Sequence, residues 1–229
     1  MNQKSWGVII ASGKGEKFTA EVDTAFLSIG SKPVLTYSLV AFEQCPDVDN
    51  LVLVVPKERL ESVRVMVQMF GCYKVKKIVA GTTQRQTSVL NGLKALEDDD
   101  VGVVTIHDAS RPSVTSFQIS ETVKAAKRYG SGVLATRIHE SVKEVNKGTS
   151  VSATLDCNKL WAVHTPQSFK YDVILKGFMA AQKRKVALND DSEALSLIRQ
   201  DVHLIAADKP VVKITGPIDI NLAEFHLRQ

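Results

Sequence analysis

The sequence predicts an α/β fold in which a mostly parallel β-sheet carries helices on both faces. Three observations predict it: apolar, β-branched runs alternate with helical patterns, a glycine-rich turn follows the first run, and one later stretch breaks the alternation. The chain has 229 residues, of which 44% are hydrophobic. We therefore expect one domain, residues 1–229, with a full core.

The apolar runs predict the strands of this sheet. Each run is nearly continuous in its apolar character, which is typical of strands buried on both faces of a Rossmann-like sheet. The expected strands are Gly7–Ile10, Asn50–Val55, Lys76–Val79, Val101–His107, Gly132–Thr136 and His203–Ala206.

Helical patterns fill the intervals between these runs. A last helix, Pro217–Leu227, is expected to begin at its proline, which is favoured in the first helical turn. The other expected helices are Val34–Cys45, Glu58–Phe70, Gln84–Glu97, Ser116–Tyr129, Tyr171–Lys183 and Ser192–Arg199.

A β-hairpin is expected within residues 138–156, where two alternating polar and apolar segments, 141–145 and 149–155, flank a Lys147-Gly148 turn. These segments have too few large apolar residues to form a core hairpin. Because an exposed two-stranded arm is marginal alone, we expect this extended arm to pack on a second subunit of a homodimer. The alternative is a flexible surface hairpin.

Composition excludes several classes of function. The 29 basic and 25 acidic residues give a net charge of +4 without a long basic run, so no nucleic-acid partner is expected. Cys45, Cys72 and Cys157 form no C-x-x-C pair, which argues against structural zinc and a disulfide framework. No secretory pattern or bilayer-length apolar stretch appears, so we expect a cytoplasmic protein with no membrane partner.

The first strand runs into Ala11-Ser12-Gly13-Lys14-Gly15-Glu16-Lys17-Phe18, a turn suited to phosphates. Gly13 and Gly15 have no Cβ, so backbone N–H groups can approach phosphate oxygens closely, and Lys14 and Lys17 add positive charge. A Gly-x-Gly pair alone is weak evidence. Its position directly after the first strand makes nucleotide binding the favoured interpretation.

The segment His107-Asp108-Ala109-Ser110-Arg111-Pro112 follows another expected strand, at the edge where open α/β sheets bind ligands. Asp108 can hold a hydroxyl or a metal ion, and Arg111 can pair with a phosphate in two-pronged fashion. The alternative is an internal Asp–Arg pair that holds the loop.

Other candidate contacts come from three segments. The run from Gly81 to Ser88 opens a helix, where Arg85 and the hydroxyls favour an anion, although ordinary capping by Thr82 or Thr83 would also explain it.

Further along, Trp161 and Phe169 are expected in the core on either side of a Thr165-Pro166 turn, whose threonine can offer a hydroxyl to a phosphate. Lys213 lies inside a strand pattern, 211–215, where a lysine is either an edge residue or a cation of the site.

Together these motifs resemble the 2-C-methyl-D-erythritol 4-phosphate cytidylyltransferases of the non-mevalonate isoprenoid pathway along nearly the whole chain. Relatives that attach CMP to ribitol 5-phosphate share the plan, but the Leu160-Trp161 and Lys213–Pro217 blocks look more like the methylerythritol branch. The matching blocks are Ala11–Gly15, Phe26–Gly30, Arg85–Leu93, His107–Pro112, Leu160–Phe169 and Lys213–Glu224.

The resemblance implies a nucleotidyltransferase that joins CTP to a polyol phosphate and releases pyrophosphate, with Mg²⁺ between the CTP phosphates. It implies nucleotide binding by Ala11, Ser12, Gly13, Lys14, Gly15, Gly81, Arg85 and Ser88. It implies catalytic roles at Lys17, Thr24 and Lys213, a metal contact at Asp108, and substrate contacts at Asp108, Ala109, Arg111, Ser141, Cys157 and Thr165.

Three positions depart from the pattern of the family. Thr24, in Asp23-Thr24-Ala25, replaces a lysine held to be catalytic, Lys17 replaces an arginine, and Cys157 replaces an arginine that grips the substrate phosphate from the partner's arm. These departures leave two further hypotheses open. The acceptor is another polyol phosphate such as ribitol 5-phosphate, or the chain is a catalytically degenerate nucleotide-binding homologue.

Overall fold

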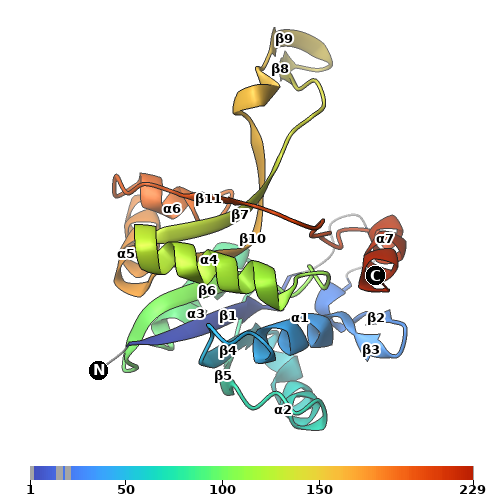
Figure 1. The fold of residues 1–229 in the computed structure, drawn as a ribbon, viewed down its shortest axis with the longest axis vertical. Helices are drawn as coiled ribbons and strands as arrows, with labels where there is room; N and C mark the ends of the chain where they lie inside the picture. Colours follow the sequence, from blue (N-terminus) through green and yellow to red (C-terminus); the bar gives the residue numbers. More distant parts are fainter. Residues whose placement is uncertain (1–2, 14–17, 19–21, 229) are drawn as a thin grey trace.

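The computed structural model describes residues 3–13, 18 and 22–228. In this part of the chain a seven-stranded sheet has the order β11-β7-β10-β6-β1-β4-β5 (Figure 1). β1 (Lys4–Ile10) lies between β4 (Asn50–Val55) and β6 (Val101–Asp108) and is parallel to both. β5 (Val75–Ala80) continues the parallel pairing beyond β4, as the predicted α/β fold requires.

The other half of the sheet contains one strand of opposite direction. β7 (Ser131–Arg137) and β11 (Leu204–Ala206) pair in parallel at the edge. β10 (Trp161–Lys170) is inserted between β7 and β6 and is antiparallel to both. The sheet is therefore mixed but mostly parallel.

The sequence pattern did not predict β10, because a proline lacks the N–H that a central strand normally donates. The ladder with β7 shifts register between Val163 and Gln167, so Pro166 falls where the pairing is interrupted. Phe169 is fully buried as predicted, whereas the core position expected for Trp161 is wrong. Trp161 is half-buried, and the Arg137 guanidinium lies 4.6 Å from the centre of its ring.

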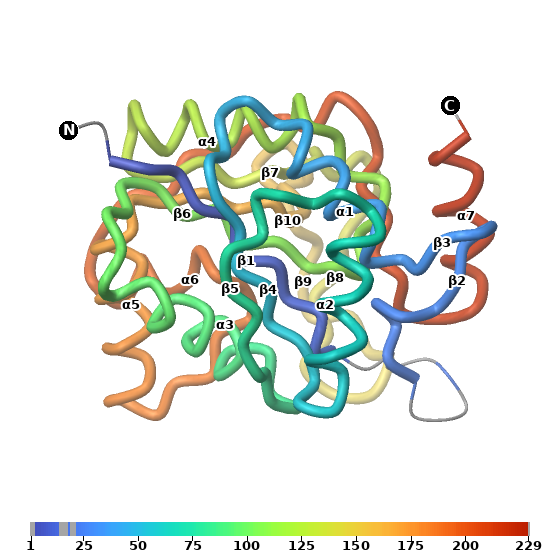
Figure 2. Tube along the Cα trace, turned by 90° about the horizontal axis from the view of Figure 1, so that it is seen from below, coloured from blue at the N-terminus to red at the C-terminus, as the bar shows by residue number. Residues whose placement is uncertain are grey.

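Helices lie on both faces of the sheet (Figure 2). They bury apolar side chains against it in two cores. Ile9 of β1 packs in one core and its neighbours Val8 and Ile10 pack in the other, which explains why the strand is apolar throughout. One core includes α1 (Val34–Glu43), α2 (Leu60–Met69) and α4 (Ser116–Tyr129); the other includes α3 (Arg85–Lys94), α5 (Tyr171–Arg184) and α6 (Glu193–Ser196).

A third, smaller cluster joins the C-terminal segment to the body. Ile214 and Ala223 pack with Ile29 and Val34, so α7 (Pro217–Leu227) lies beside the short strands β2 (Ser28–Ile29) and β3 (Lys32–Pro33). The bounds of α4 and α7 are as predicted. α6 is shorter than the predicted Ser192–Arg199. Arg199 lies beyond its end and has a positive φ of 57°, which is incompatible with a right-handed helix.

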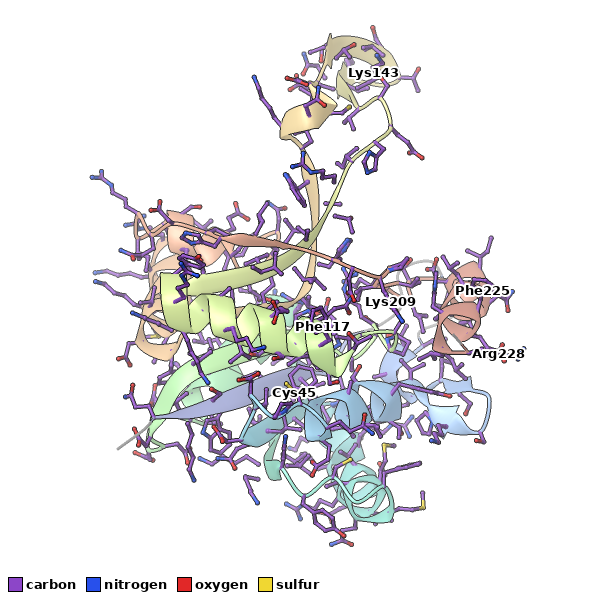
Figure 3. The ribbon with its side chains drawn as sticks, in the orientation of Figure 1. Cys45, Phe117, Lys143, Lys209, Phe225 and Arg228 are labelled. Atoms are coloured by element: carbon purple, nitrogen blue, oxygen red, sulfur yellow. The ribbon has the colours of Figure 1, made fainter. Side chains whose placement is uncertain are left out.

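The predicted hairpin forms an arm that projects from the body (Figure 1). β8 (Lys143–Lys147) and β9 (Ser150–Thr154) pair antiparallel, and Gly148 has a φ of 60°, which glycine adopts without steric cost. Lys143 lies near the outer end of this arm, well away from Lys209 on the body (Figure 3). Within the described residues, no helix has both the length and the apolar character needed to cross a bilayer.

Candidate active site

The predicted motifs converge at the carboxyl ends of β1 and β6. In the seven-stranded sheet, β4 and β5 lie on one side of β1 and β6 lies on the other. The strand order therefore reverses beside β1, and open α/β sheets bind ligands at such a switch point. Ile10 pairs with Asp108 across the two strands, which places the glycine-rich turn beside the Asp108 loop. The described residues that line the pocket are Ile10, Ala11, Gly13, Thr24, Ala25, Thr83, Arg85, Asp108, Ser110, Lys213, Ile214 and Thr215.

Asp108 is at the centre of a charge network in this pocket. Its Oδ1 accepts a hydrogen bond of 2.7 Å from Arg85 Nε, while Oδ2 lies 3.3 Å from Lys213 Nζ and 3.8 Å from Arg111 Nε. Burial acts to raise the pKa of the Asp108 carboxyl, but the charges of Arg85, Lys213 and Arg111 outweigh it and hold this pKa well below its usual range. Asp108 is therefore ionised.

Arg85 is also held by Asp191, a second carboxylate that sequence reasoning missed. Arg85 Nη1 and Nη2 donate to the two oxygens of Asp191 at 2.8 and 2.7 Å, a two-pronged pair, and the Asp191 side chain is 1% exposed. Burial acts to lower the pKa of Arg85, but the two carboxylates keep it well above its usual value. The sequence offered only the pair Asp190-Asp191 before a short helix as a sign of a functional carboxylate. The same pattern is equally typical of residues that cap a helix.

Lys213 reaches Asp108 from an irregular segment, so the predicted strand at 211–215 is wrong. The N–H groups of this segment bond to the Asp108 loop instead of a strand: Ile214 N–H donates to the Ser110 carbonyl at 2.8 Å, and Val212 N–H donates to Ser113 Oγ at 3.1 Å. The Lys213 side chain is 40% exposed and lines the pocket. Its ammonium is thus held near Asp108 and remains accessible to a ligand.

Arg111 is embedded in the protein and fits the alternative of an internal Asp–Arg pair. Its side chain is 12% exposed, and its Nη1 donates to the Val211 carbonyl at 3.0 Å and lies 3.4 Å from His164 Nδ1. Burial acts to lower the pKa of Arg111, and the Asp108 charge opposes this. Arg111 therefore ties the segment that carries Lys213 to the Asp108 loop.

Ser12, in the glycine-rich turn, is in contact with Gly81 and Ser88. Ser12 Oγ donates to Ser88 Oγ at 2.9 Å, and Ser88 Oγ accepts from Thr82 N–H at 2.8 Å. A Cβ on Gly81 would lie 2.5 Å from Ser12 Oγ, so this close approach requires glycine. The N-cap of α3 is Gln84, whose own side chain makes no capping bond. Thr82 Oγ1 accepts from the Gln84 N–H at 3.2 Å, so Thr82 holds the start of the helix, as the capping alternative in part expected.

Thr165 supports Asp108 from β10. Its Oγ1 accepts from Asp108 N–H at 3.0 Å and lies 3.1 Å from His107 Nδ1, and His107 Nε2 lies 3.3 Å from Ser38 Oγ. Burial lowers the pKa of His107 to about 3, so the ring is neutral. The Thr165 hydroxyl is used within the protein and the residue does not line the pocket.

The remaining predicted residues before the arm fall into three groups. Thr24 lines the pocket and is 4% exposed. Ala109 is fully buried in the core, and its N–H donates to the Ile10 carbonyl at 2.9 Å. Lys14, Gly15 and Lys17 lie outside the described residues.

Ser141 lies in the arm, which projects from the body of the molecule (Figure 1), and Cys157 directly follows the arm. Neither residue lines the pocket. Ser141 is exposed, and Cys157 Sγ lies 2.8 Å from the Glu140 carbonyl oxygen. These two residues are not brought to the pocket within one chain.

A metal ion fits this pocket only in company with a phosphorylated ligand. Among the described residues, no group of three or more His, Cys, Asp or Glu side chains could hold a metal ion. Asp108 offers one ionised carboxylate, and Mg²⁺ commonly combines a few protein carboxylates with phosphate oxygens of the substrate. The residues therefore fit Mg²⁺ that arrives with a triphosphate.

The chain is similar to known proteins over nearly its whole length. The family model described as "IspD: 2-C-methyl-D-erythritol 4-phosphate cytidylyltransferase" matches residues 6–229. A 2-C-methyl-D-erythritol 4-phosphate cytidylyltransferase of Clostridium perfringens (strain SM101 / Type A) is 35% identical over 222 residues, 96% of this chain and 97% of that one. One of Desulforamulus reducens is 37% identical over 223 residues, 97% of this chain and 95% of that one.

Solved structures support the fold independently. The structure described as 4-diphosphocytidyl-2C-methyl-D-erythritolsynthase from Anaerococcus prevotii DSM 20548 has a TM-score of 0.86 to this chain at 23% identity. The match covers 99% of this chain and 97% of that chain.

Proposed function

Because this chain belongs to the 2-C-methyl-D-erythritol 4-phosphate cytidylyltransferase family, we propose that its chemistry takes place in the pocket at the carboxyl ends of β1 and β6. The chain is a cytidylyltransferase of isoprenoid biosynthesis that transfers CMP from CTP to 2-C-methyl-D-erythritol 4-phosphate and releases pyrophosphate. The observation that carries the assignment to this pocket is the convergence of Arg85, Lys213 and Arg111 on Asp108.

The reaction is an in-line displacement. An oxygen of the acceptor phosphate attacks the α-phosphorus of CTP, a new P–O bond forms, and the bond to pyrophosphate breaks. No covalent enzyme intermediate is needed, so catalysis consists of positioning and of neutralising negative charge on the phosphates. The Ala11 N–H donates to the Val54 carbonyl at 2.8 Å, so Ala11 contributes to the wall of the pocket. The backbone N–H of Gly13, with Lys14 and Lys17, is assigned to the CTP phosphates, and the accessible Lys213 ammonium is assigned to the reacting centre.

Asp108 is assigned a double role in this scheme. Its Oδ2 holds Lys213 in the pocket, and the same carboxylate would contribute an oxygen to Mg²⁺ that enters with CTP. When bound, Mg²⁺ supplies positive charge that neutralises the phosphates. Arg85, with Nε on Oδ1, keeps the carboxylate oriented, and Thr165 fixes its backbone N–H.

The proposal includes a homodimer built through the 138–156 arm of a single nucleotidyltransferase domain, and a cytoplasmic location. Val145, Val151 and Leu155 are 44%, 55% and 38% exposed, and an arm with such apolar residues is stabilised by packing on a partner. In that arrangement Ser141 and Cys157 of one chain serve the substrate phosphate in the pocket of the other.

The test is pyrophosphate release by the purified chain with CTP, Mg²⁺ and 2-C-methyl-D-erythritol 4-phosphate. Release is expected, and Lys213→Met, which keeps the length of the side chain but removes its charge, is expected to lower kcat roughly a hundredfold or more. If pyrophosphate is released with ribitol 5-phosphate but not with 2-C-methyl-D-erythritol 4-phosphate, the acceptor assigned here is wrong. Binding of CTP without turnover of either acceptor would overturn the catalytic assignment.

A further inference from the structure

The function proposed above gives no role to Asp191, yet its contacts lead directly to the pocket. We propose that Asp191 is a positioning residue for CMP transfer: by holding Arg85 in a two-pronged pair, it restricts Arg85 to one oxygen of Asp108. The inference rests on the proposed reaction site at Asp108.

The contacts of Arg85 divide its guanidinium between two carboxylates. Nη1 and Nη2 donate to Asp191, and only Nε is directed to Asp108, where it bonds to Oδ1. Oδ2 of Asp108 is the oxygen that lies 3.3 Å from Lys213 Nζ. Oδ1 of Asp108 is therefore bound by Arg85, and Oδ2 faces Lys213, with Arg111 Nε farther away at 3.8 Å.

Without the Asp191 carboxylate, which accepts from both Nη atoms, this division would be lost. Arg85 would be free to rotate and to present a pair of N–H groups to both oxygens of Asp108, which is the geometry an arginine and a carboxylate favour. Lys213 would then compete with Arg85 for Oδ2. The ammonium would lose its fixed place, and small displacements of charged groups at a phosphoryl centre cost large factors in rate.

Burial of Asp191 is not explained by helix capping. Its side chain is 1% exposed, and an ionised carboxylate is costly to bury unless it is paired. The neighbouring Asp190 performs the capping instead: its Oδ1 accepts from the N–H of Glu193 at 3.0 Å and from the Ser192 hydroxyl at 3.0 Å. Both side-chain oxygens of Asp191 are directed to Arg85, which separates its role from that of Asp190.

The experiment compares Asp191→Asn with the matched control Asp190→Asn, in the full chain, by steady-state pyrophosphate release. We expect Asp191→Asn to lower kcat roughly tenfold or more while the KM for CTP changes less than about threefold, and Asp190→Asn to leave kcat within about threefold. A double-mutant cycle adds Arg85→Gln: because Asp191 acts through Arg85, the double variant should match Arg85→Gln alone in kcat/KM.

Three outcomes overturn the inference while the unaltered chain remains active: an unchanged kcat in Asp191→Asn, equal losses in both Asp→Asn variants, or independent losses in the cycle. If Asp191→Asn does not fold, Arg85→Lys decides, because lysine keeps the charge but cannot hold both carboxylates. A kcat loss of roughly tenfold or more in a folded Arg85→Lys chain supports the inference, and an unchanged kcat refutes it. Inactivity of the unaltered chain would instead refute the proposed function.

Discussion

The hydroxyl of Thr165 accepts a hydrogen bond of 3.0 Å from the backbone N–H of Asp108, across the pair of strands β10 and β6. The antiparallel strand therefore fixes the residue on which the cations of the pocket converge. Thr165 is 4% exposed, so water cannot replace its oxygen there.

Thr165→Val should be strongly destabilising. Valine has nearly the same shape but leaves Asp108 N–H and His107 Nδ1 without the hydroxyl that they share, and each unsatisfied buried polar group costs about 1–3 kcal/mol. We expect the free energy of unfolding in urea to fall by about 2–4 kcal/mol. Thr165→Ser keeps the hydroxyl and should lose about 1 kcal/mol; equal losses in the two variants would contradict the network.

His107 should make the fold sensitive to acid. Burial lowers its pKa from the usual 6.5 of a histidine to about 3, so the unfolded chain takes up a proton first as the pH falls. The free energy of unfolding therefore decreases as the pH falls from about 6.5 towards 3, and this group alone accounts for about 2 kcal/mol between pH 7 and pH 5.

Urea unfolding at pH 7 and pH 5 measures this contribution. His107→Gln is expected to be less stable at pH 7 because it loses its buried contacts, but to lose less stability between the two pH values. His139→Gln changes an exposed histidine on the arm and should keep the pH dependence of the unaltered chain. The prediction fails if His107→Gln and the unaltered chain show the same difference.

The arm gives a prediction about assembly. Val145 and Val151 are 44% and 55% exposed, so Val145→Ser with Val151→Ser should leave the monomer folded but weaken a dimer that buries them. We expect a larger fraction of monomer in sedimentation equilibrium. Val65→Ser, at a 62% exposed position on α2, is the control and should not change the mass distribution. A chain that is monomeric before any substitution would rule out the arm-mediated dimer.

The local sequence pattern was sufficient for strands whose environment is apolar on both faces. β4 has the predicted bounds because every residue in Asn50–Val55 is buried, and α4 has its predicted bounds because Thr115 and Gly130 cap its ends. β10 could not be found in this way. It alternates weakly, contains a proline, and is held by pairing with strands on both sides.

The same limit applies to the site. Asp108 and the glycine-rich turn were singled out because each directly follows an expected strand, and ligands bind at the carboxyl ends of such strands. The Asp191 partner of Arg85, by contrast, is 106 residues away in sequence. Nothing local distinguishes Asp191 from Asp190. Burial and pairing separate the two carboxylates, and both come from tertiary structure.

Thr24 provides the most direct test of how the missing charge affects catalysis. The residue is 4% exposed and lines the pocket together with Arg85, Asp108 and Lys213, so a longer side chain at position 24 can extend towards the phosphates. Removing a cation from a phosphoryl transition state typically costs on the order of a hundredfold in rate. We therefore expect Thr24→Lys to raise kcat for pyrophosphate release by about tenfold or more. Thr24→Met, which has similar length and no charge, is the control and should give no increase. If both variants have the same kcat, the chain has compensated for its missing lysine elsewhere, and the charge at position 24 does not limit the reaction.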